Sequence, residues 1–305
     1  MSSASGMQLE HEPTNPPRRG LRKGVYLVPS FFTAANIGMG FFSVMSCLRG
    51  FQLLAGPSPD INGAASHLDS AAIAIGFAVL FDMLDGRIAR MTKTTTEIGI
   101  QLDSIADVVT FGLAPAVLAY VWGYGPGMMD STPLHRLALF LSFMYLMCGA
   151  FRLARFNVQA SRPRIMAEGT IKVDKKSFVG LPIPVAGGLI AAIVHFTPAP
   201  LIRFGPERAR VYAGLLMLLV GLLSVMMVST LRFSSFKTVG TRSRSMRTVI
   251  LILALGMLIA LYSQYVLLAL VVAYILHGLL ARLFSMFWRR SETAEAKLES
   301  KTRET

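Results

Sequence analysis

The sequence predicts an all-α polytopic membrane protein, a helical bundle of about eight transmembrane helices with both termini in the cytoplasm. Of its 305 residues, 53% are hydrophobic and only 15% are charged, which is more apolar than an ordinary soluble domain. The apolar residues also gather into windows of about 20 residues, the length that a helix needs to cross a bilayer. The distribution of Lys and Arg then orients these windows.

Eight apolar windows define the expected spans. They cover residues 25–48, 69–91, 99–121, 136–158, 180–197, 210–231, 247–263 and 266–287. The fifth begins in the Pro-containing stretch GLPIPVAGG, and the seventh and eighth are divided only by the short stretch YSQY (262–265), so a count of six or seven spans stays open. Residues 1–24 and 291–305 are polar, and we expect both to be disordered cytoplasmic tails.

Basic residues set the expected orientation. With the N-terminus inside, 25 of the 30 Lys and Arg residues fall in cytoplasmic segments and five on the opposite side. Cytoplasmic segments carry such an excess in membrane proteins. Because the charges cluster between apolar runs, we expect contact with anionic membrane lipids and no nucleic-acid partner. Cys47 and Cys148 lie inside apolar runs and are expected to be packing residues, and His195 and His277 receive no role.

Four aspartates interrupt the apolar pattern between residues 81 and 107. Asp82 and Asp85 are three residues apart and Asp103 and Asp107 are four apart, so each pair lies on one helical face. The polar stretch 92–97 turns the chain, and the two pairs are expected to face each other. Carboxylates held together need cations to stay ionised, and oxygen ligands suit Mg²⁺ or Mn²⁺, with Ca²⁺ a further candidate. The sequence predicts two divalent ions, an arrangement typical of phosphoryl chemistry.

A plainer interpretation exists for each of these residues taken singly. One aspartate at a helix end can cap the helix or pair with a neighbouring Arg or Lys. Gly86, Ala89 and Gly99 can serve close helix packing, which is common in membranes. Because these residues have no side chain or only a methyl group, they also leave room for a bulky ligand to approach the backbone. The gathering of four acidic residues in an apolar setting favours the metal site.

The pattern D-G-x-x-A-R, eight residues, then G-x-x-x-D-x-x-x-D resembles the signature of the CDP-alcohol phosphatidyltransferase family. Residues 85–107 match it at every defined position, and Asp82 supplies the additional upstream aspartate common in that family. The resemblance implies that Asp82, Asp85 and Asp103 ligate two divalent ions that hold the CDP pyrophosphate. Asp107 would contact a metal and remove the proton of the acceptor hydroxyl. The positions implied for the CDP-lipid site are Gly86, Ala89, Arg90 and Gly99.

Other segments resemble the membrane-bound phosphatidylserine synthases of bacteria and archaea within this family. They are PSFFTAANIGMGFFS (29–43), DSIADVVTFGLAPA (103–116), CGAFRLARFNV (148–158), FVGLPIPVAGG (178–188) and VSTLRFSSFK (228–237). The resemblance implies a membrane domain over residues 25–240, followed by two additional helices over 241–290. It also implies CDP-diacylglycerol as donor, L-serine as acceptor, and a site on the cytoplasmic face of a prokaryotic inner membrane.

Several alternatives stay open. Choline, inositol or glycerol 3-phosphate could be the acceptor, and the protein could form a homodimer. A cation transporter is the alternative from another class, because intramembrane carboxylates often mark ion pathways. Against transport, all four aspartates lie at one edge of the predicted membrane region.

Four basic residues at span ends are candidates for binding the serine carboxylate or the donor phosphate. They are Arg152, Arg155, Arg232 and Lys237. A guanidinium can bind either group bidentately, although such residues also serve as membrane anchors without a ligand. Of the first two we favour Arg155, because Phe156 and Asn157 follow it at the membrane edge. Asn36, polar within the first span, is a candidate for either an interhelical hydrogen bond or a cytidine contact.

Overall fold

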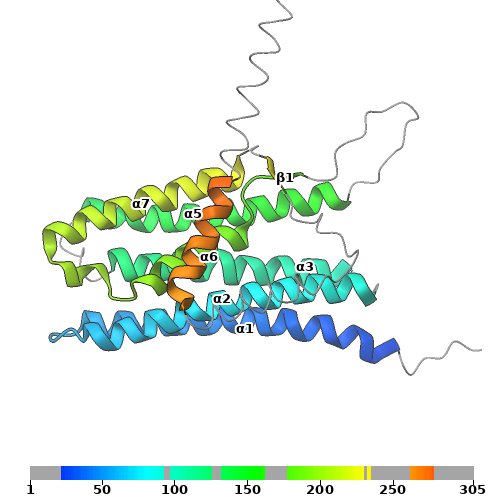
Figure 1. Ribbon diagram of the computed structural model, residues 1–305, viewed down its shortest axis with the longest axis horizontal. Helices are drawn as coiled ribbons and strands as arrows, with labels where there is room; N and C mark the ends of the chain where they lie inside the picture. The colour runs from blue at the N-terminus through cyan, green and yellow to red at the C-terminus, as the bar shows by residue number, and fades with distance from the viewer. Residues whose placement is uncertain are drawn as a thin grey trace, which may run out of the picture.

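Long helices laid side by side dominate the computed structural model (Figure 1). It describes residues 22–92, 97–125, 132–161, 177–229, 232–234 and 262–277. The long helices are α1 (Arg22–Ala55), α2 (Ile61–Thr92), α5 (Thr132–Ser161) and α7 (Pro206–Val228), and shorter ones are α3 (Glu97–Asp107), α4 (Ala114–Ala119) and α6 (Ile183–Phe196). A further helix, Tyr262–His277, crosses the bundle obliquely.

Five of the described helices are long and apolar enough to cross a membrane. They are Phe31–Ala55, Ile61–Leu84, Ile98–Tyr124, Pro133–Val158 and Pro206–Val228. These confirm the first four predicted windows and the sixth. Large side chains on their outer faces are exposed, such as Leu218 at 70% and Phe31 at 68%, as expected where lipid tails take the place of water. The protein is therefore an integral membrane protein.

The fifth, seventh and eighth predicted windows do not form long spanning helices within the described residues. The fifth forms α6, whose 14 residues extend about 21 Å, less than the bilayer core. Most of the seventh window, 247–263, lies outside the described residues. In the eighth, residues 266–277 are helical, and so are residues 262–265, where we expected a connection. The count of eight spans and the orientation of the termini stay predictions, as do the disordered tails, most of which lie outside the described residues.

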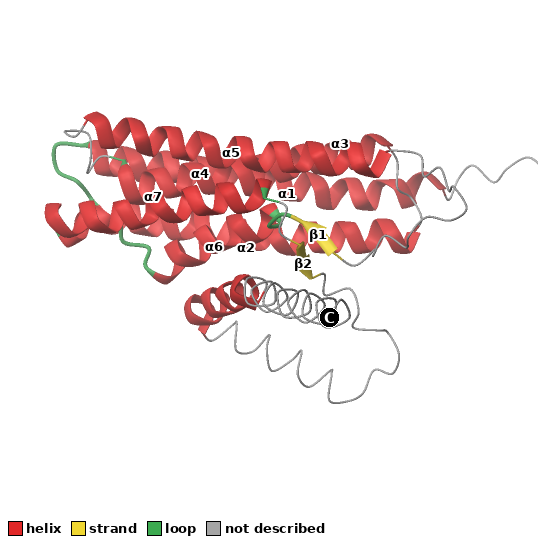
Figure 2. Ribbon diagram, turned by 90° about the horizontal axis from the view of Figure 1, so that it is seen from above, coloured by secondary structure: helices red, strands yellow, loops and turns green. Residues whose placement is uncertain are grey.

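The described residues form the predicted all-α bundle, and a short antiparallel ribbon lies beside its helices. β1 (Ser177–Val179) pairs with β2 (Arg232–Ser234), and Figure 2 shows this ribbon at the edge of the bundle. Proline disfavours helical backbone in the residue before it, so the run before Pro182 is extended and α6 begins only at Ile183. Gly180 turns the chain between them with a φ of 85°, where a side chain would collide with the Met227 carbonyl.

The third membrane crossing is a composite helix rather than the continuous one that we expected over 99–121. Two wider π turns, η1 (Val108–Leu113) and η2 (Tyr120–Tyr124), flank α4. Pro115 has no N–H to donate to the carbonyl of Phe111 four residues earlier. The Tyr145 hydroxyl of α5 donates to that carbonyl instead, at 3.1 Å. The first π turn thus begins directly after Asp107, and π turns often occur at functional sites.

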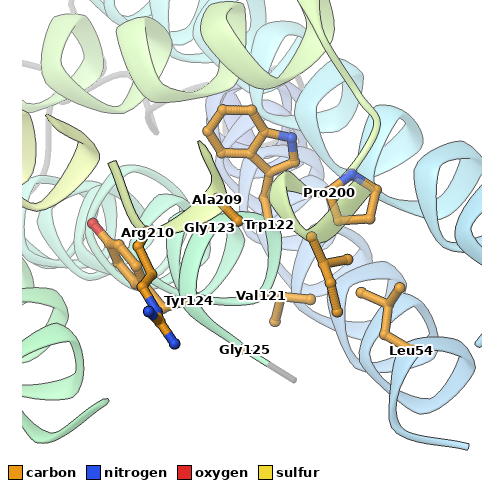
Figure 3. A pocket seen from close by; sticks show the side chains of 10 residues that line it. Leu54, Val121, Trp122, Gly123, Tyr124, Gly125, Pro200, Ala209 and Arg210 are labelled. Atoms are coloured by element: carbon orange, nitrogen blue, oxygen red, sulfur yellow. The ribbon is translucent and has the colours of Figure 1, made fainter. Parts of the chain in front are cut away.

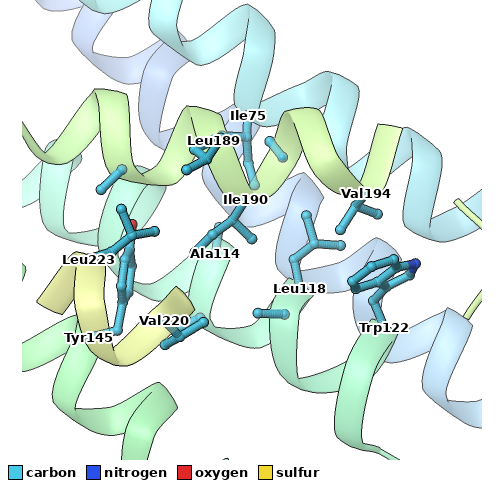
Figure 4. Close-up of a cluster of buried hydrophobic side chains, with 14 of the residues drawn as sticks. Ile75, Ala114, Leu118, Trp122, Tyr145, Leu189, Ile190, Val194, Val220 and Leu223 are labelled. Atoms are coloured by element: carbon cyan, nitrogen blue, oxygen red, sulfur yellow. The ribbon is translucent and has the colours of Figure 1, made fainter. Parts of the chain in front are cut away.

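The core lies where α6 packs onto this composite helix (Figure 4). Ile75 of α2, Leu118 of α4 and Ile190 of α6 are buried together there. A β-carbon on Gly187 would lie 3.1 Å from the Phe111 carbonyl oxygen, so the glycine permits the close approach of α6. The Trp122 indole donates to the carbonyls of Thr197 (2.9 Å) and Ala199 (3.1 Å), beyond the last turn of α6.

The antiparallel packing gathers particular helix ends. The C-terminal turns of α2, α5 and α7 and the N-terminal turns of α1, α3 and α6 meet at one end of the bundle, which we call the site end. The Phe32 ring of α1 and the Phe81 ring of α2, with centroids 6.3 Å apart, meet there. The opposite end, near the connection between α1 and α2, is called the distal end.

Gly40 gives the first prediction, because it lets α1 contact the π turn η1. A β-carbon there would lie 2.5 Å from the Thr110 hydroxyl oxygen and 2.9 Å from the Thr110 α-carbon. Gly40→Ala should therefore destabilise the bundle by roughly 1–3 kcal/mol, as overpacking does, measured as unfolding in mixed micelles. Gly38→Ala is the matched control, since no described atom lies within 4 Å of its β-carbon. Equal stability of the two variants would contradict this packing.

Candidate active site

Three of the four predicted aspartates come together at the site end. Asp82 projects from the last part of α2, and Asp103 and Asp107 come from α3. One carboxylate oxygen from each lies within 4.8 Å of the others. Asp107 is 9% exposed and the other two are partly buried. Asp85 lies on α2, but its side chain is outside the described part of the structure.

This aspartate cluster fits a divalent cation. All three groups are carboxylates, which hard cations such as Mg²⁺, Mn²⁺ and Ca²⁺ prefer. Ligand distances of about 2.0–2.6 Å place opposite oxygens about 4–5 Å apart around one ion, which agrees with the observed spacing. Three carboxylates in a partly buried site repel one another, and a bound cation removes that cost.

The end of α5 brings positive charge to the cluster. Arg152 is 8% exposed and its guanidinium interacts electrostatically with Asp107. Its Nε–H is buried and donates to no partner among the described residues. Arg155, one turn later, donates from Nη1 to the Val228 carbonyl of α7 at 3.3 Å. The two arginines therefore differ. Arg152 keeps a buried N–H that can still donate a hydrogen bond, whereas Arg155 already uses one of its N–H groups to hold α7.

A polar contact fixes α5 against α3 beside the aspartates. The Asn157 amide donates to the Ser104 hydroxyl at 2.8 Å, and this hydroxyl donates to the Ile100 carbonyl at 3.0 Å. Ser104 directly follows Asp103 in the sequence. The contact thus sets the height of the Arg152 turn relative to the aspartate cluster.

Helix α1 adds a buried polar face. Asn36 is 1% exposed, and neither its side-chain oxygen nor its nitrogen has a hydrogen-bond partner within the described ranges. Its backbone carbonyl accepts from the Thr110 hydroxyl at 3.0 Å, one turn beyond Asp107. A buried amide without hydrogen-bond partners is rare in proteins. The Asn36 side chain can therefore form hydrogen bonds with water or a polar ligand. Thr33, three residues earlier and 5% exposed, was missed by the sequence argument, although its spacing from Asn36 is helical.

The other predicted positions are placed only in part. Gly86 and Gly99 are exposed on α2 and α3. Ala89 and Arg90 belong to α2 without described side chains, and Arg232 pairs through its backbone with Val179 in the ribbon. Lys237 lies outside the described residues.

A pocket at the distal end is not part of this site (Figure 3). It is a small, partly open cavity of about 20 Å³, lined mostly by apolar residues of α1, η2 and α7, with Arg210 at its edge. Leu54, in its wall, lies 18 residues from Asn36 along α1, or about 27 Å. The aspartates and this pocket therefore occupy opposite ends of the bundle.

Known proteins resemble this chain over much of its length. Residues 26–204 match the CDP-alcohol phosphatidyltransferase family. The chain is 30% identical to a CDP-diacylglycerol–serine O-phosphatidyltransferase of Helicobacter pylori over 86% of its own length and 93% of that protein. It is 31% identical to the enzyme of the same name from Bacillus subtilis, over 69% and 91%. An archaetidylserine synthase of Methanothermobacter thermautotrophicus is 29% identical over 54% and 56%. The chain belongs to the CDP-alcohol phosphatidyltransferase family.

Proposed function

We propose that this protein transfers the phosphatidyl group of CDP-diacylglycerol to L-serine, giving phosphatidylserine and CMP. The observation that carries the proposal is the aspartate cluster beside the buried Arg152 guanidinium, at one end of an apolar bundle. Relatives with this activity in their names align over most of the chain. An enzyme that joins a membrane-bound donor to a water-soluble acceptor needs its site at such an end.

The aspartates bind the donor substrate, CDP-diacylglycerol, in this proposal. Asp82 and Asp103, together with Asp85, would hold divalent ions, as the family resemblance implies. When bound, such ions would supply positive charge to the pyrophosphate of the CDP head and to the departing CMP. The acyl chains would stay in the bilayer beside the exposed apolar faces of the helices. We propose that this end faces the cytoplasm of a prokaryotic cell, where serine is dissolved.

The acceptor half uses Asp107 as the base. Its carboxylate is the most buried of the cluster and would accept the proton of the serine hydroxyl. The hydroxyl oxygen then forms a bond to the phosphorus that carries the lipid. The bond from that phosphorus to the CMP oxygen breaks, and CMP leaves with the electron pair. One displacement balances the reaction without a covalent enzyme intermediate.

Arg152 is the proposed partner of the serine carboxylate. Its guanidinium is buried and interacts electrostatically with Asp107, the proposed base, and its Nε has no partner among the described residues. Arg155 already donates to Val228. The contacts therefore favour Arg152 over Arg155, the reverse of the order that the sequence suggested. Arg232 and Lys237 stay candidates for the donor phosphate.

Purified protein should release CMP from CDP-diacylglycerol when serine is present, and labelled serine should appear in the lipid product. Choline, inositol and glycerol 3-phosphate should support little release. Excess EDTA should abolish the reaction and Mg²⁺ or Mn²⁺ should restore it, because the cluster needs cations to bind pyrophosphate. Undiminished turnover in EDTA would falsify the metal-dependent reading, and faster release with another alcohol would replace serine as acceptor.

The aspartates should separate by role in steady-state kinetics. Asp103→Asn should weaken metal activation and raise the KM for CDP-diacylglycerol. Asp107→Asn should instead lower kcat by about 10²- to 10⁴-fold, the usual range for losing a general base, and change donor binding less. Near wild-type kcat in Asp107→Asn would remove this residue from the role of base.

Arg152→Ala should raise the KM for serine more than the KM for CDP-diacylglycerol. A charge-assisted hydrogen bond contributes about 1.5–3 kcal/mol, which corresponds to roughly 10- to 100-fold in KM. Arg155→Ala, one turn away, is the matched control and should change serine KM less. If Arg152→Ala loses donor affinity alone, this arginine binds phosphate and the serine site lies elsewhere.

A further inference from the structure

An open apolar groove lies toward the distal end of the bundle, between the last turn of α6, the turn η4 (Leu201–Phe204) and the first half of α7. Its volume is about 360 Å³, which is within the range of small-molecule sites. We call it the distal groove. Its floor consists of buried side chains and its rim of exposed ones: Trp122, Leu201 and Leu216 in the floor, and Phe196, Tyr212 and Leu215 on the rim.

Contacts among the described residues hold the walls of this groove in place. The Trp122 indole is fixed by its hydrogen bonds to the chain that follows α6. His195 is next to the rim residue Phe196. Its ring contacts the Asp69 carboxylate of α2 through Nδ1 and lies 2.9 Å from the Ser263 hydroxyl through Nε2. The groove is therefore already formed, as small-molecule sites usually are.

Two arginines lie where the groove opens toward the distal end. Arg203 directly precedes Phe204, which lines the groove. Arg208 is one turn before Tyr212 on α7, so the two side chains share a helical face, and side chains on a helix tilt toward its N-terminus. Both arginines are exposed, and neither forms an ion pair within the described ranges. An apolar groove thus leads up to two positive charges.

This concentration of positive charge is exceptional for its side of the membrane. Only five of the 30 Lys and Arg residues fall on the side opposite the predicted cytoplasmic face, and three of those five lie between residues 203 and 210. Glu207, the acidic residue in that stretch, pairs with Arg210 at 3.5 Å. The charges of Arg203 and Arg208 are therefore left to bind an anion, and a guanidinium binds phosphate well.

We propose that the distal groove binds an anionic phospholipid from the leaflet at the distal end. One acyl chain would lie in the groove, and the phosphate would contact Arg203 and Arg208. Hydrocarbon gains little by leaving other lipid tails for a protein surface, so the headgroup decides which lipid binds. A zwitterionic headgroup brings its own positive charge to the two guanidinium groups and should bind more weakly. This site is at the opposite end of the bundle from the aspartates and does not depend on phosphatidyl transfer.

The chain carries its own probe for this lipid. Of its two tryptophans, Trp122 forms part of the groove floor and lies at one end of the buried cluster in Figure 4, and Trp288 can be replaced by Phe. Brominated acyl chains quench tryptophan fluorescence on contact. In Trp288→Phe protein reconstituted in phosphatidylcholine, a small fraction of brominated phosphatidylglycerol should quench Trp122 more than the same fraction of brominated phosphatidylcholine. The relative affinity should be roughly 10- to 30-fold for two arginines.

Charge variants test the headgroup contact. Arg203→Gln and Arg208→Gln should each lower the preference for phosphatidylglycerol roughly fivefold, and the double variant should show almost none. Arg49→Gln is the matched control, because it removes one exposed positive charge at the same end of the bundle, from α1, and Arg49 does not line the groove. It should keep the preference of the parent protein.

A pair of neighbouring leucines tests the acyl-chain contact. Leu219 lines the groove, whereas Leu218 is 70% exposed and does not line it. Leu219→Phe should narrow the groove and reduce quenching of Trp122 by brominated phosphatidylglycerol. Leu218→Phe adds the same ring on the outer face of α7 and should leave quenching unchanged.

Two outcomes would overturn the proposal. Equal quenching by the two brominated lipids would mean that Trp122 meets ordinary bilayer lipid without selection. No quenching by either lipid would mean that protein fills the groove. Fluorescence needs no turnover, so either result would leave the proposed phosphatidyl transfer standing, and a protein inactive toward serine could still show the lipid preference.

Discussion

Electrostatic repulsion among three carboxylates in an apolar bundle is the constraint on which the rest of this structure depends. Asp82, Asp103 and Asp107 lie within a few ångströms of one another, and hydrocarbon offers no solvent to separate their charges. The cluster must therefore sit at a helix end, near water and cations. That requirement places the C-terminal end of α2 and the N-terminal end of α3 at the site end. It also explains why the buried guanidinium of Arg152 and the polar face of α1 occur at the same level.

Much of this could be predicted from the sequence. The five long spans follow from window length, and the closeness of Asp103 and Asp107 follows from four-residue spacing in a helix. The composite third crossing could not be predicted, because it depends on Tyr145 replacing the hydrogen bond that Pro115 cannot make, 30 residues away in the chain. The ribbon depends likewise on pairing between segments that lie more than 50 residues apart.

The site illustrates the same limit. Arg152 and Arg155 lie on one helix three residues apart, and sequence patterns cannot rank them. What separates them is the neighbour that each meets: Asp107 for the first and the Val228 carbonyl for the second. His195 received no role from the sequence because its partners, Asp69 and Ser263, are 126 and 68 residues distant. Local reasoning identifies chemical groups, whereas packing decides which of them cooperate.

The π turn that follows Asp107 has a consequence for how this helix can change during evolution. A π turn holds about one residue more than an α turn, so it absorbs an insertion without rotating the segments on either side. One half of the third crossing carries the aspartates and the other half fills the core. The π turn between them lets each half keep its own rotation about the helix axis. Substitutions that repack α4 against α6 can accumulate while the carboxylates keep their direction. Chains with different cores could in this way share one unchanged reactive centre.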